Sequence, residues 1–182
     1  KHLESITAKL EEMGVEVEDF GDAVRIKPAA GPLRRINVKT MPYPGYPTDM
    51  NPQIAVLLCL AQGTSILTEG VWDPRFKYVE ELTRMGASIT VDGRKAVIEG
   101  GKPLKPATVK CSDLRAGAAM VIAALATEGE TIIENIYHIE RGYEHLVEKL
   151  SGAGADIKKI YLMTLKRNIP LRKKWKLQKP LL

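Results

Sequence analysis

Two short segments of the sequence place an aspartate directly before an apolar stretch. Asp49 stands in PYPGYPTDM and Asp113 stands in CSDLRAG, and an apolar run of helical length follows each. An aspartate at this place either caps the helix by accepting hydrogen bonds from its first amides or takes a proton from a ligand. Since Thr48 and Ser112 can also act as caps, we expect both carboxylates to be available for other work.

Three arginines accompany these aspartates. Arg75 in WDPRF and Arg141 in YHIERGYE follow corresponding strand patterns, and Arg115 lies two residues after Asp113. A guanidinium at the positive end of a helix needs an anionic partner. That partner is either a neighbouring carboxylate or the carboxylate or phosphate of a ligand, which arginine binds through paired hydrogen bonds. The residues by themselves therefore predict a polar, anion-binding face.

An internal repeat explains why these residues recur. LAQGTSILTEGVWDPR lies over LATEGETIIENIYHIER, and the helix patterns ITAKLEEMGVEV, VEELTRMGASITV and LVEKLSGAGADIKKI add a partial third copy. Asp49 then corresponds to Asp113, and Arg75 to Arg141. Equivalent loops of repeated units fall on one face. We therefore expect the following five side chains to converge on one rim: Asp49, Arg75, Asp113, Arg115 and Arg141.

Each repeat shows the pattern of strand, helix, strand, helix, strand. The first helices, near 54–61 and 116–126, are apolar all round and so must be buried on every side. The second helices, near 77–85 and 143–153, are expected to be amphipathic, with one apolar face, and to face the surface. The strand patterns lie at 36–40, 64–69, 107–111 and 130–135. Glycines after the second helices and the turns DFGD and VDGRK predict helix ends followed by hairpins.

Composition narrows the class of protein. The chain has 182 residues, 45% of them hydrophobic and 27% charged, which is typical of one globular domain. No apolar run reaches 18 residues, so we expect no membrane span. Cys59 and Cys111 suggest no disulfide framework, which favours the cytoplasm, and both are interpreted as packing residues. The histidines show no metal-ligand spacing and there is no glycine-rich phosphate loop, so we expect neither metal nor cofactor.

The net charge of +5 comes from the last segment of the chain. Residues 161–182 contain seven Lys and Arg and no acid, and without them about 20 basic residues face 22 acidic ones. Such a segment can bind nucleic acid or anionic lipid. The periodic pattern stops after Ile160, however, and chain ends are often loose. We therefore expect residues 161–182 to be a basic tail that is disordered or non-native.

Four motifs carry a resemblance to a known family. PYPGYPTDM, DPRF, SDLRAGAAM and IYHIERGYEHLVEKL, in this order, resemble the UDP-N-acetylglucosamine 1-carboxyvinyltransferases, a bacterial family of enolpyruvyl transferases. The resemblance covers residues 1–160 and corresponds to the C-terminal portion of the family. The related 5-enolpyruvylshikimate-3-phosphate synthases share the repeat but not PTDM followed by YHIERGYE. The resemblance implies an α-β repeat fold, an inside-out α/β barrel domain with buried helices surrounded by sheets.

The resemblance also implies an activity, the transfer of enolpyruvyl from phosphoenolpyruvate to the 3′-hydroxyl of UDP-N-acetylglucosamine. This reaction is the first committed step of peptidoglycan synthesis. It makes Asp49 the general base at the sugar hydroxyl and Arg141 a ligand of phosphoenolpyruvate, and these two are the predicted catalytic residues. Val71 matches a backbone contact to the nucleotide sugar. Three more residues match active-site positions without a defined role: Arg75, Asp113 and Arg115.

Other parts of the family's active site have no counterpart in this sequence. The family's reactive cysteine, a Lys-Asn pair and another arginine belong to an N-terminal domain, and neither Cys59 nor Cys111 can replace that cysteine. We expect this missing domain of the same enzyme to be a partner and the chain alone to be inactive. Two alternatives remain: a shikimate-type enolpyruvyl transferase, and a non-catalytic domain whose basic tail binds nucleic acid or a membrane.

Overall fold

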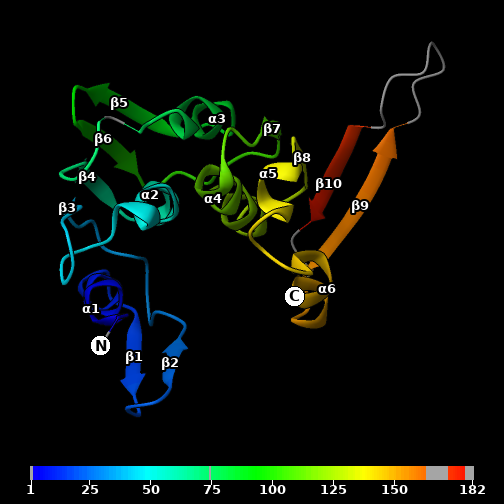
Figure 1. Cartoon of the computed structure of the whole chain (residues 1–182). Helices are drawn as coiled ribbons and strands as arrows, with labels where there is room; N and C mark the ends of the chain where they lie inside the picture. Colours follow the sequence, from blue (N-terminus) through cyan, green and yellow to red (C-terminus); the bar gives the residue numbers. More distant parts are fainter. Residues whose placement is uncertain (1, 74, 163–171, 179–182) are drawn as a thin grey trace. The chain divides into compact units, whose positions relative to one another are not determined.

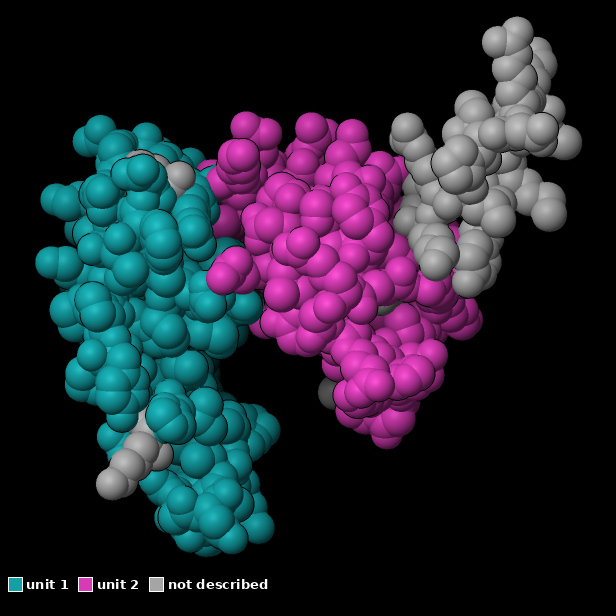
Figure 2. All heavy atoms as spheres, viewed as in Figure 1, with its two compact units in different colours: residues 1–76, 87–102 teal, residues 77–86, 103–182 magenta. Residues whose placement is uncertain are grey.

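The computed structural model describes residues 2–73, 75–162 and 172–178, which form two compact units. Unit 1 comprises Lys1–Phe76 and Ala87–Lys102, and unit 2 comprises Lys77–Gly86 and Pro103–Leu182 (Figure 2). The chain therefore leaves unit 1 for ten residues and returns to it before it completes unit 2. In the described part of the chain, no helix is long and apolar enough to cross a membrane.

Unit 1 contains the N-terminal helix, a hairpin and the first full repeat apart from its second helix (Figure 1). Its elements are α1 (Glu4–Glu12), β1 (Glu16–Asp19), β2 (Val24–Lys27), β3 (Val38–Lys39), η1 (Thr48–Met50), α2 (Asn51–Leu60), β4 (Gly63–Thr68), β5 (Ser88–Asp92) and β6 (Lys95–Gly100). The pairs β1–β2 and β5–β6 are antiparallel, which confirms both predicted hairpins.

Unit 2 contains the second repeat together with a helix from the first. Its elements are α3 (Tyr78–Arg84), β7 (Thr108–Lys110), α4 (Leu114–Leu125), β8 (Glu130–Glu134), α5 (Tyr137–Glu140), α6 (Leu146–Gly152), β9 (Asp156–Leu162) and β10 (Arg172–Gln178). A strand thus stands at 172–178, within the segment for which the sequence predicted a loose tail. The remainder of that tail, 163–171 and 179–182, lies outside the described residues.

The two four-stranded sheets have the same topology, which confirms the repeat. Their strand orders are β3-β4-β6-β5 and β7-β8-β10-β9. In each sheet the first pair is parallel and the other pairs are antiparallel. The registers also correspond, because Val38 lies opposite Leu67 in one sheet and Val109 opposite Ile133 in the other. Corresponding residues of the two units can therefore be compared directly.

The first helix of each repeat is buried, as its apolar sequence predicted. Eight residues of α2 and eight of α4 are buried. Gly100 of β6 comes so close to the end of α2 that a Cβ there would lie 2.2 Å from the Ala61 carbonyl oxygen. A Cβ on Gly117 of α4 would lie 2.4 Å from Ile139 of α5. Glycine is required at both positions because neighbouring atoms occupy the space of a side chain.

The second helices differ more than the sequence predicted. Helix α3 packs against α4 and β7 and buries Val79 and Leu82, with Met85 buried just after it. The predicted helix at 143–153 begins only at Leu146, because His145 has a φ of 50° and stands outside the helical conformation. None of the residues of α6 is buried. The shared pattern therefore gives one core helix and one peripheral helix.

Candidate active site

Asp49 lies on a short turn directly before the buried helix α2. The preceding loop is closed by the Met41 amide, which donates to the Tyr46 carbonyl at 2.9 Å, and the Tyr46 side chain is only 4% exposed. Asp49 itself is exposed and sits in the 3-10 turn η1. The N-cap residue of α2 makes no side-chain capping bond. The loop therefore holds Asp49 at the protein surface without using it as the N-cap of α2.

The sequence suggested that Thr48 could cap α2, but its hydroxyl donates to Glu69 instead. Glu69 follows β4, and its side chain is fully buried. One of its oxygens, Oε2, accepts from Thr48 Oγ1 and Asn51 Nδ2, each at 2.9 Å. The other, Oε1, accepts from Thr40 Oγ1 at 2.6 Å and from the amides of Val71 at 2.9 Å and Trp72 at 3.2 Å. This cluster was not predicted from the sequence.

The hydrogen bonds keep Glu69 ionised despite its burial. Burial by itself raises the pKa of a carboxyl group, but the bonds from Thr40, the Val71 and Trp72 amides and Thr48 outweigh it, so the pKa of Glu69 is lowered. The only signal in the sequence was an acid placed between a strand pattern and a glycine, in SILTEGVW. A single acid at such a place is usually solvent-exposed, so this signal is weak.

The segment after Glu69 carries Val71 and Arg75 of the predicted site. Arg94 also holds it, because its guanidinium donates to the Trp72 carbonyl at 2.9 Å. The Arg75 guanidinium lies over the Trp72 ring, 4.8 Å from the ring centroid. The backbone amides of Val71 and Trp72 therefore donate to Glu69, and the Arg75 guanidinium stacks on the Trp72 ring. The buried carboxylate of Glu69 thus contacts Thr48 and Asn51, which flank Asp49, and the segment that carries Val71 and Arg75.

In unit 2, Asp113 caps α4, and the expectation that Ser112 would do so is wrong. Asp113 has an extended backbone, and its Oδ1 accepts from the amides of Arg115 and Ala116, each at 2.9 Å. The Ser112 hydroxyl donates to Asp113 Oδ2 at 3.1 Å instead. The carboxylate therefore stabilises the first turn of the helix, and its Oδ2 is the oxygen turned toward Ser112.

Arg115 and Arg141 lie near the same end of α4. Arg115 is in its first turn, and Arg141 follows the short helix α5, which packs against α4. Gly142 brings the two segments together, because a Cβ there would lie 2.8 Å from the Leu114 side chain. Unit 2 therefore groups the positions of Asp113, Arg115 and Arg141. The convergence of this group with that of unit 1 stays a prediction.

Both cysteines are buried free thiols, as the sequence predicted. Burial raises the pKa of Cys59 to about 12. Burial, together with the nearby carboxylates of Asp113 and Glu81, raises the pKa of Cys111 to about 12 as well. A nucleophilic cysteine needs a lowered pKa. Neither thiol therefore has the properties of a reactive cysteine.

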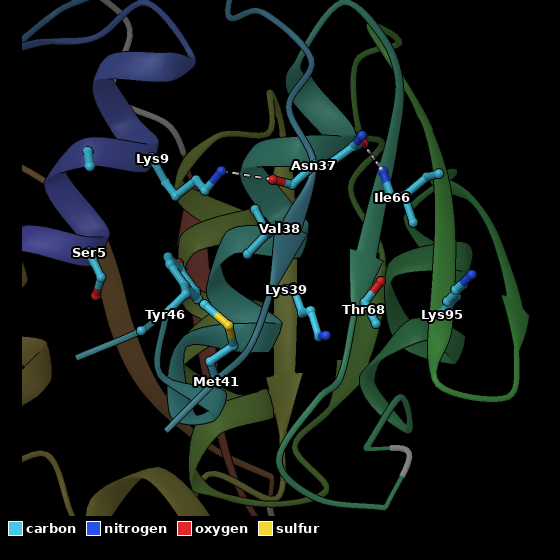
Figure 3. A pocket seen from close by; sticks show the side chains of 12 residues that line it. Ser5, Lys9, Asn37, Val38, Lys39, Met41, Tyr46, Ile66, Thr68 and Lys95 are labelled. Atoms are coloured by element: carbon cyan, nitrogen blue, oxygen red, sulfur yellow. Dashed lines mark hydrogen bonds between the residues drawn. The ribbon is translucent and has the colours of Figure 1, made fainter. Parts of the chain in front are cut away.

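Unit 1 has a cavity of about 550 Å³, whose lining includes Met41 and Tyr46 of the loop that precedes Asp49 (Figure 3). Lys9, Lys39 and Lys95 line it, and Lys9 donates to the Asn37 carbonyl at 2.9 Å. None of the six predicted site residues is part of its lining. Over the described ranges, no three His, Cys, Asp or Glu side chains gather in a way that could hold a metal ion.

Comparison with known proteins gives consistent results. Residues 1–150 match the family described as EPSP synthase (3-phosphoshikimate 1-carboxyvinyltransferase). The chain is 55% identical over 159 residues to UDP-N-acetylglucosamine 1-carboxyvinyltransferase 3 of Caldanaerobacter subterraneus subsp. tengcongensis. It is 51% identical over 162 residues to UDP-N-acetylglucosamine 1-carboxyvinyltransferase 1 of Symbiobacterium thermophilum. These matches cover 87% and 88% of this chain but 38% and 36% of the relatives, so the chain spans little more than a third of their length.

Two solved structures are similar to the chain. The enolpyruvyl transferase NikO from Streptomyces tendae superposes with a TM-score of 0.78 at 36% identity, over 85% of this chain and 36% of that one. EPSP synthase from Acinetobacter baumannii superposes with a TM-score of 0.55 over 96% of this chain and 56% of that one. At 15% identity, the second likeness concerns the fold alone.

Proposed function

Since the chain belongs to the EPSP synthase (3-phosphoshikimate 1-carboxyvinyltransferase) family and has the predicted fold of α-β repeats with buried helices, we propose that it is part of an enolpyruvyl transferase. Its acceptor substrate is the 3′-hydroxyl of UDP-N-acetylglucosamine, and its donor is phosphoenolpyruvate. The names of the relatives at 51–55% identity specify UDP-N-acetylglucosamine, which supports this nucleotide sugar as the acceptor. The enzyme acts in peptidoglycan synthesis, and the two buried free thiols favour a reducing cytoplasm.

Asp49 is the proposed general base of this reaction. It takes the proton of the sugar hydroxyl as that oxygen forms a bond to the central carbon of phosphoenolpyruvate. The methylene carbon of phosphoenolpyruvate takes up a proton in the same step. When the bond between the central carbon and the phosphate oxygen then breaks, the methylene carbon loses a proton again, the double bond is restored and inorganic phosphate leaves. An exposed carboxylate on a turn closed by hydrogen bonds supports this role, because a base must come within hydrogen-bond reach of the proton that it takes. This placement of Asp49 is the observation that carries the proposal.

The arginines are proposed to bind the negative charges of the substrates. Arg141 binds phosphoenolpyruvate, and Arg75 and Arg115 stabilise the charge that develops on the departing phosphate. Asp113 orients the first turn of α4, in which Arg115 lies. Val71 contacts the nucleotide sugar through its backbone. The chain needs the N-terminal domain of the same enzyme as its partner, because the family's reactive cysteine lies there.

Binding to the 182-residue chain tests the acceptor substrate. We expect UDP-N-acetylglucosamine to shift the NMR signals of Asp49 and Val71, and 3-phosphoshikimate to leave them unchanged. Asp49→Asn should weaken binding about tenfold, as the loss of one hydrogen bond to a charged group does. Asp92→Asn, which changes an exposed carboxylate in the β5–β6 hairpin, is the matched control. A response to 3-phosphoshikimate alone would favour the shikimate-type alternative.

A second experiment concerns catalysis and the tail. We expect no phosphate release from the chain alone with both substrates, and measurable turnover would contradict the need for the missing domain. The alternative of a nucleic-acid- or membrane-binding domain predicts that deleting residues 161–182 abolishes a salt-sensitive interaction. Because β10 pairs with β8 and β9, this deletion also removes a strand of the sheet. Replacing Lys173, Lys174 and Lys176 by Gln is therefore the better variant.

A further inference from the structure

Glu69 is a buried carboxylate of unit 1 that joins two segments of the proposed site. We propose that Glu69 is a positioning residue that holds the Asp49 turn and the Val71 segment in a common geometry through its ionised carboxylate. This role deepens the proposed function and rests on it for the identity of the substrate. Glu69 itself is 0% exposed, so it acts through its neighbours and does not contact the substrate.

The two carboxylate oxygens of Glu69 hold different segments of the proposed site. Oε2 accepts from Thr48 and Asn51, which flank Asp49 in the sequence. Oε1 accepts from the Val71 and Trp72 amides, in the segment proposed to contact the nucleotide sugar. The rigid, planar carboxylate therefore separates the two sets of donors, and neither set can shift without stretching a charge-assisted hydrogen bond.

A further contact fixes the segment from the other side. Thr40 donates to Glu69 Oε1 at 2.6 Å, and its hydroxyl oxygen accepts from the Gly70 amide at 2.9 Å. A Cβ on Gly70 would lie 2.3 Å from the Thr40 carbonyl oxygen, so the backbone approaches as closely as glycine permits. Three successive backbone amides thus donate hydrogen bonds to this cluster: Gly70 to the Thr40 hydroxyl, and Val71 and Trp72 to Glu69. The segment is preorganised before a ligand binds.

The chemistry requires a carboxylate rather than any polar side chain. Among the described residues, the five groups that form hydrogen bonds with the Glu69 carboxylate are all donors, and an ionised carboxylate is an acceptor at both oxygens. Glutamine has the same shape but only one acceptor, and its NH2 group would face the donors on Thr48 and Asn51. These would have to turn around, and the bonds to the Val71 and Trp72 amides would lose their charge assistance. Glu69→Gln therefore tests the role with little change in volume.

Amide hydrogen exchange of the full 182-residue chain is the first measurement. In Glu69→Gln we expect exchange at Val71 and Trp72 to accelerate about tenfold or more, with a parallel increase at Met50 in the Asp49 turn. Thr48→Val severs only the bond to the turn, so it should accelerate Met50 and leave Val71 and Trp72 protected. Ile98→Val, a core change in β6, controls for general loss of stability and should affect neither segment selectively.

Titration with UDP-N-acetylglucosamine is the second measurement. We expect about tenfold weaker binding by Glu69→Gln and unchanged binding by Ile98→Val, a contrast that a merely structural role would not produce. Unchanged exchange at Val71 and Trp72 in Glu69→Gln would overturn the proposal, as would equal losses of affinity in both variants. If the parent chain did not bind the nucleotide sugar, the proposed function would fail, whereas the exchange data would still decide whether Glu69 joins the two segments.

Discussion

In unit 1 the residue after the second strand is Glu69, whereas the corresponding residue of unit 2 is Asn135, which is exposed and has a φ of 58°. Two positions whose side chains donate to Glu69 in unit 1 also hold different residues in unit 2. Thr40 corresponds to the buried Cys111, since the amide of each donates to the neighbouring strand, and Asn51 corresponds to Arg115. Unit 1 thus has a buried carboxylate with donors around it. Unit 2 has a thiol and a left-handed turn instead.

This difference accounts for the two roles of the aspartates. In unit 1 the Thr48 hydroxyl is drawn to Glu69, and α2 begins after a 3-10 turn that carries Asp49. In unit 2 no acid follows β8 at position 135, and the hydroxyl of Ser112 donates to Asp113, which caps α4. The same motif therefore supplies an exposed carboxylate in one unit and a structural cap in the other. The change from Glu69 to Asn135 at the end of the second strand, together with the changes at Thr40 and Asn51, accompanies this difference.

The largest expected effect concerns this residue directly. Glu69→Ala should lower the free energy of unfolding by about 4 kcal/mol, because it leaves buried donors without their charged acceptor. Asn135→Ala should cost about 1 kcal/mol, the strain of a left-handed backbone in alanine. Urea denaturation of both variants measures the contrast. Equal losses would mean that the two positions are equivalent after all.

The second helices offer the next contrast. Leu82 of α3 is 0% exposed, whereas the corresponding Leu150 of α6 is only partly buried. We expect Leu82→Ala to cost about 3 kcal/mol and Leu150→Ala about 1 kcal/mol, because only the first leaves a closed cavity. Thermal unfolding followed by circular dichroism gives the comparison. A larger loss for Leu150→Ala would contradict the assignment of α6 as peripheral.

A smaller effect separates the two aspartates. Asp113→Ala should reduce the free energy of unfolding by about 1 kcal/mol, since it removes both capping bonds of α4. Asp49→Ala should change it by less than about 0.5 kcal/mol, as is usual for exposed positions. Both variants should be measured in one denaturant series. If Asp49→Ala were the more destabilising change, Asp49 would be primarily a structural residue.

The smallest effect is the acid dependence of stability. The pKa of Glu69 is lowered in the folded protein, so the unfolded chain binds the proton first as the pH falls. The contribution of its ionised form is therefore complete above about pH 5 and is lost as the pH falls through the folded pKa, below about 4.3. The stability difference between the parent chain and Glu69→Gln should be constant from pH 8 to 5 and then shrink. Growth of this difference in acid would contradict the mechanism.

Much of the fold follows from the sequence because periodicity and turn residues are local signals. The all-apolar runs of α2 and α4, both hairpins and the glycine after α3 needed no knowledge of distant contacts. Glu69 could not be identified in this way, because its partners Thr40, Thr48 and Asn51 come from three other segments and meet only in the folded chain. The strand at 172–178 was missed for a different reason. Its many basic residues suggested a loose tail, although Trp175 and Leu177 alternate with lysines as residues of a strand do.

The passage of the chain from unit 1 to α3 and back has a practical consequence. A single cut cannot separate the units, since a break after Phe76 takes β5 and β6 away from β4, and a break after Lys102 leaves α3 without α4. Shortened expression clones ending at either point should yield insoluble or protease-sensitive material. A cut in the turn of the β5–β6 hairpin would instead leave β6 paired with both β5 and β4, so the chain should tolerate an interruption best at this turn.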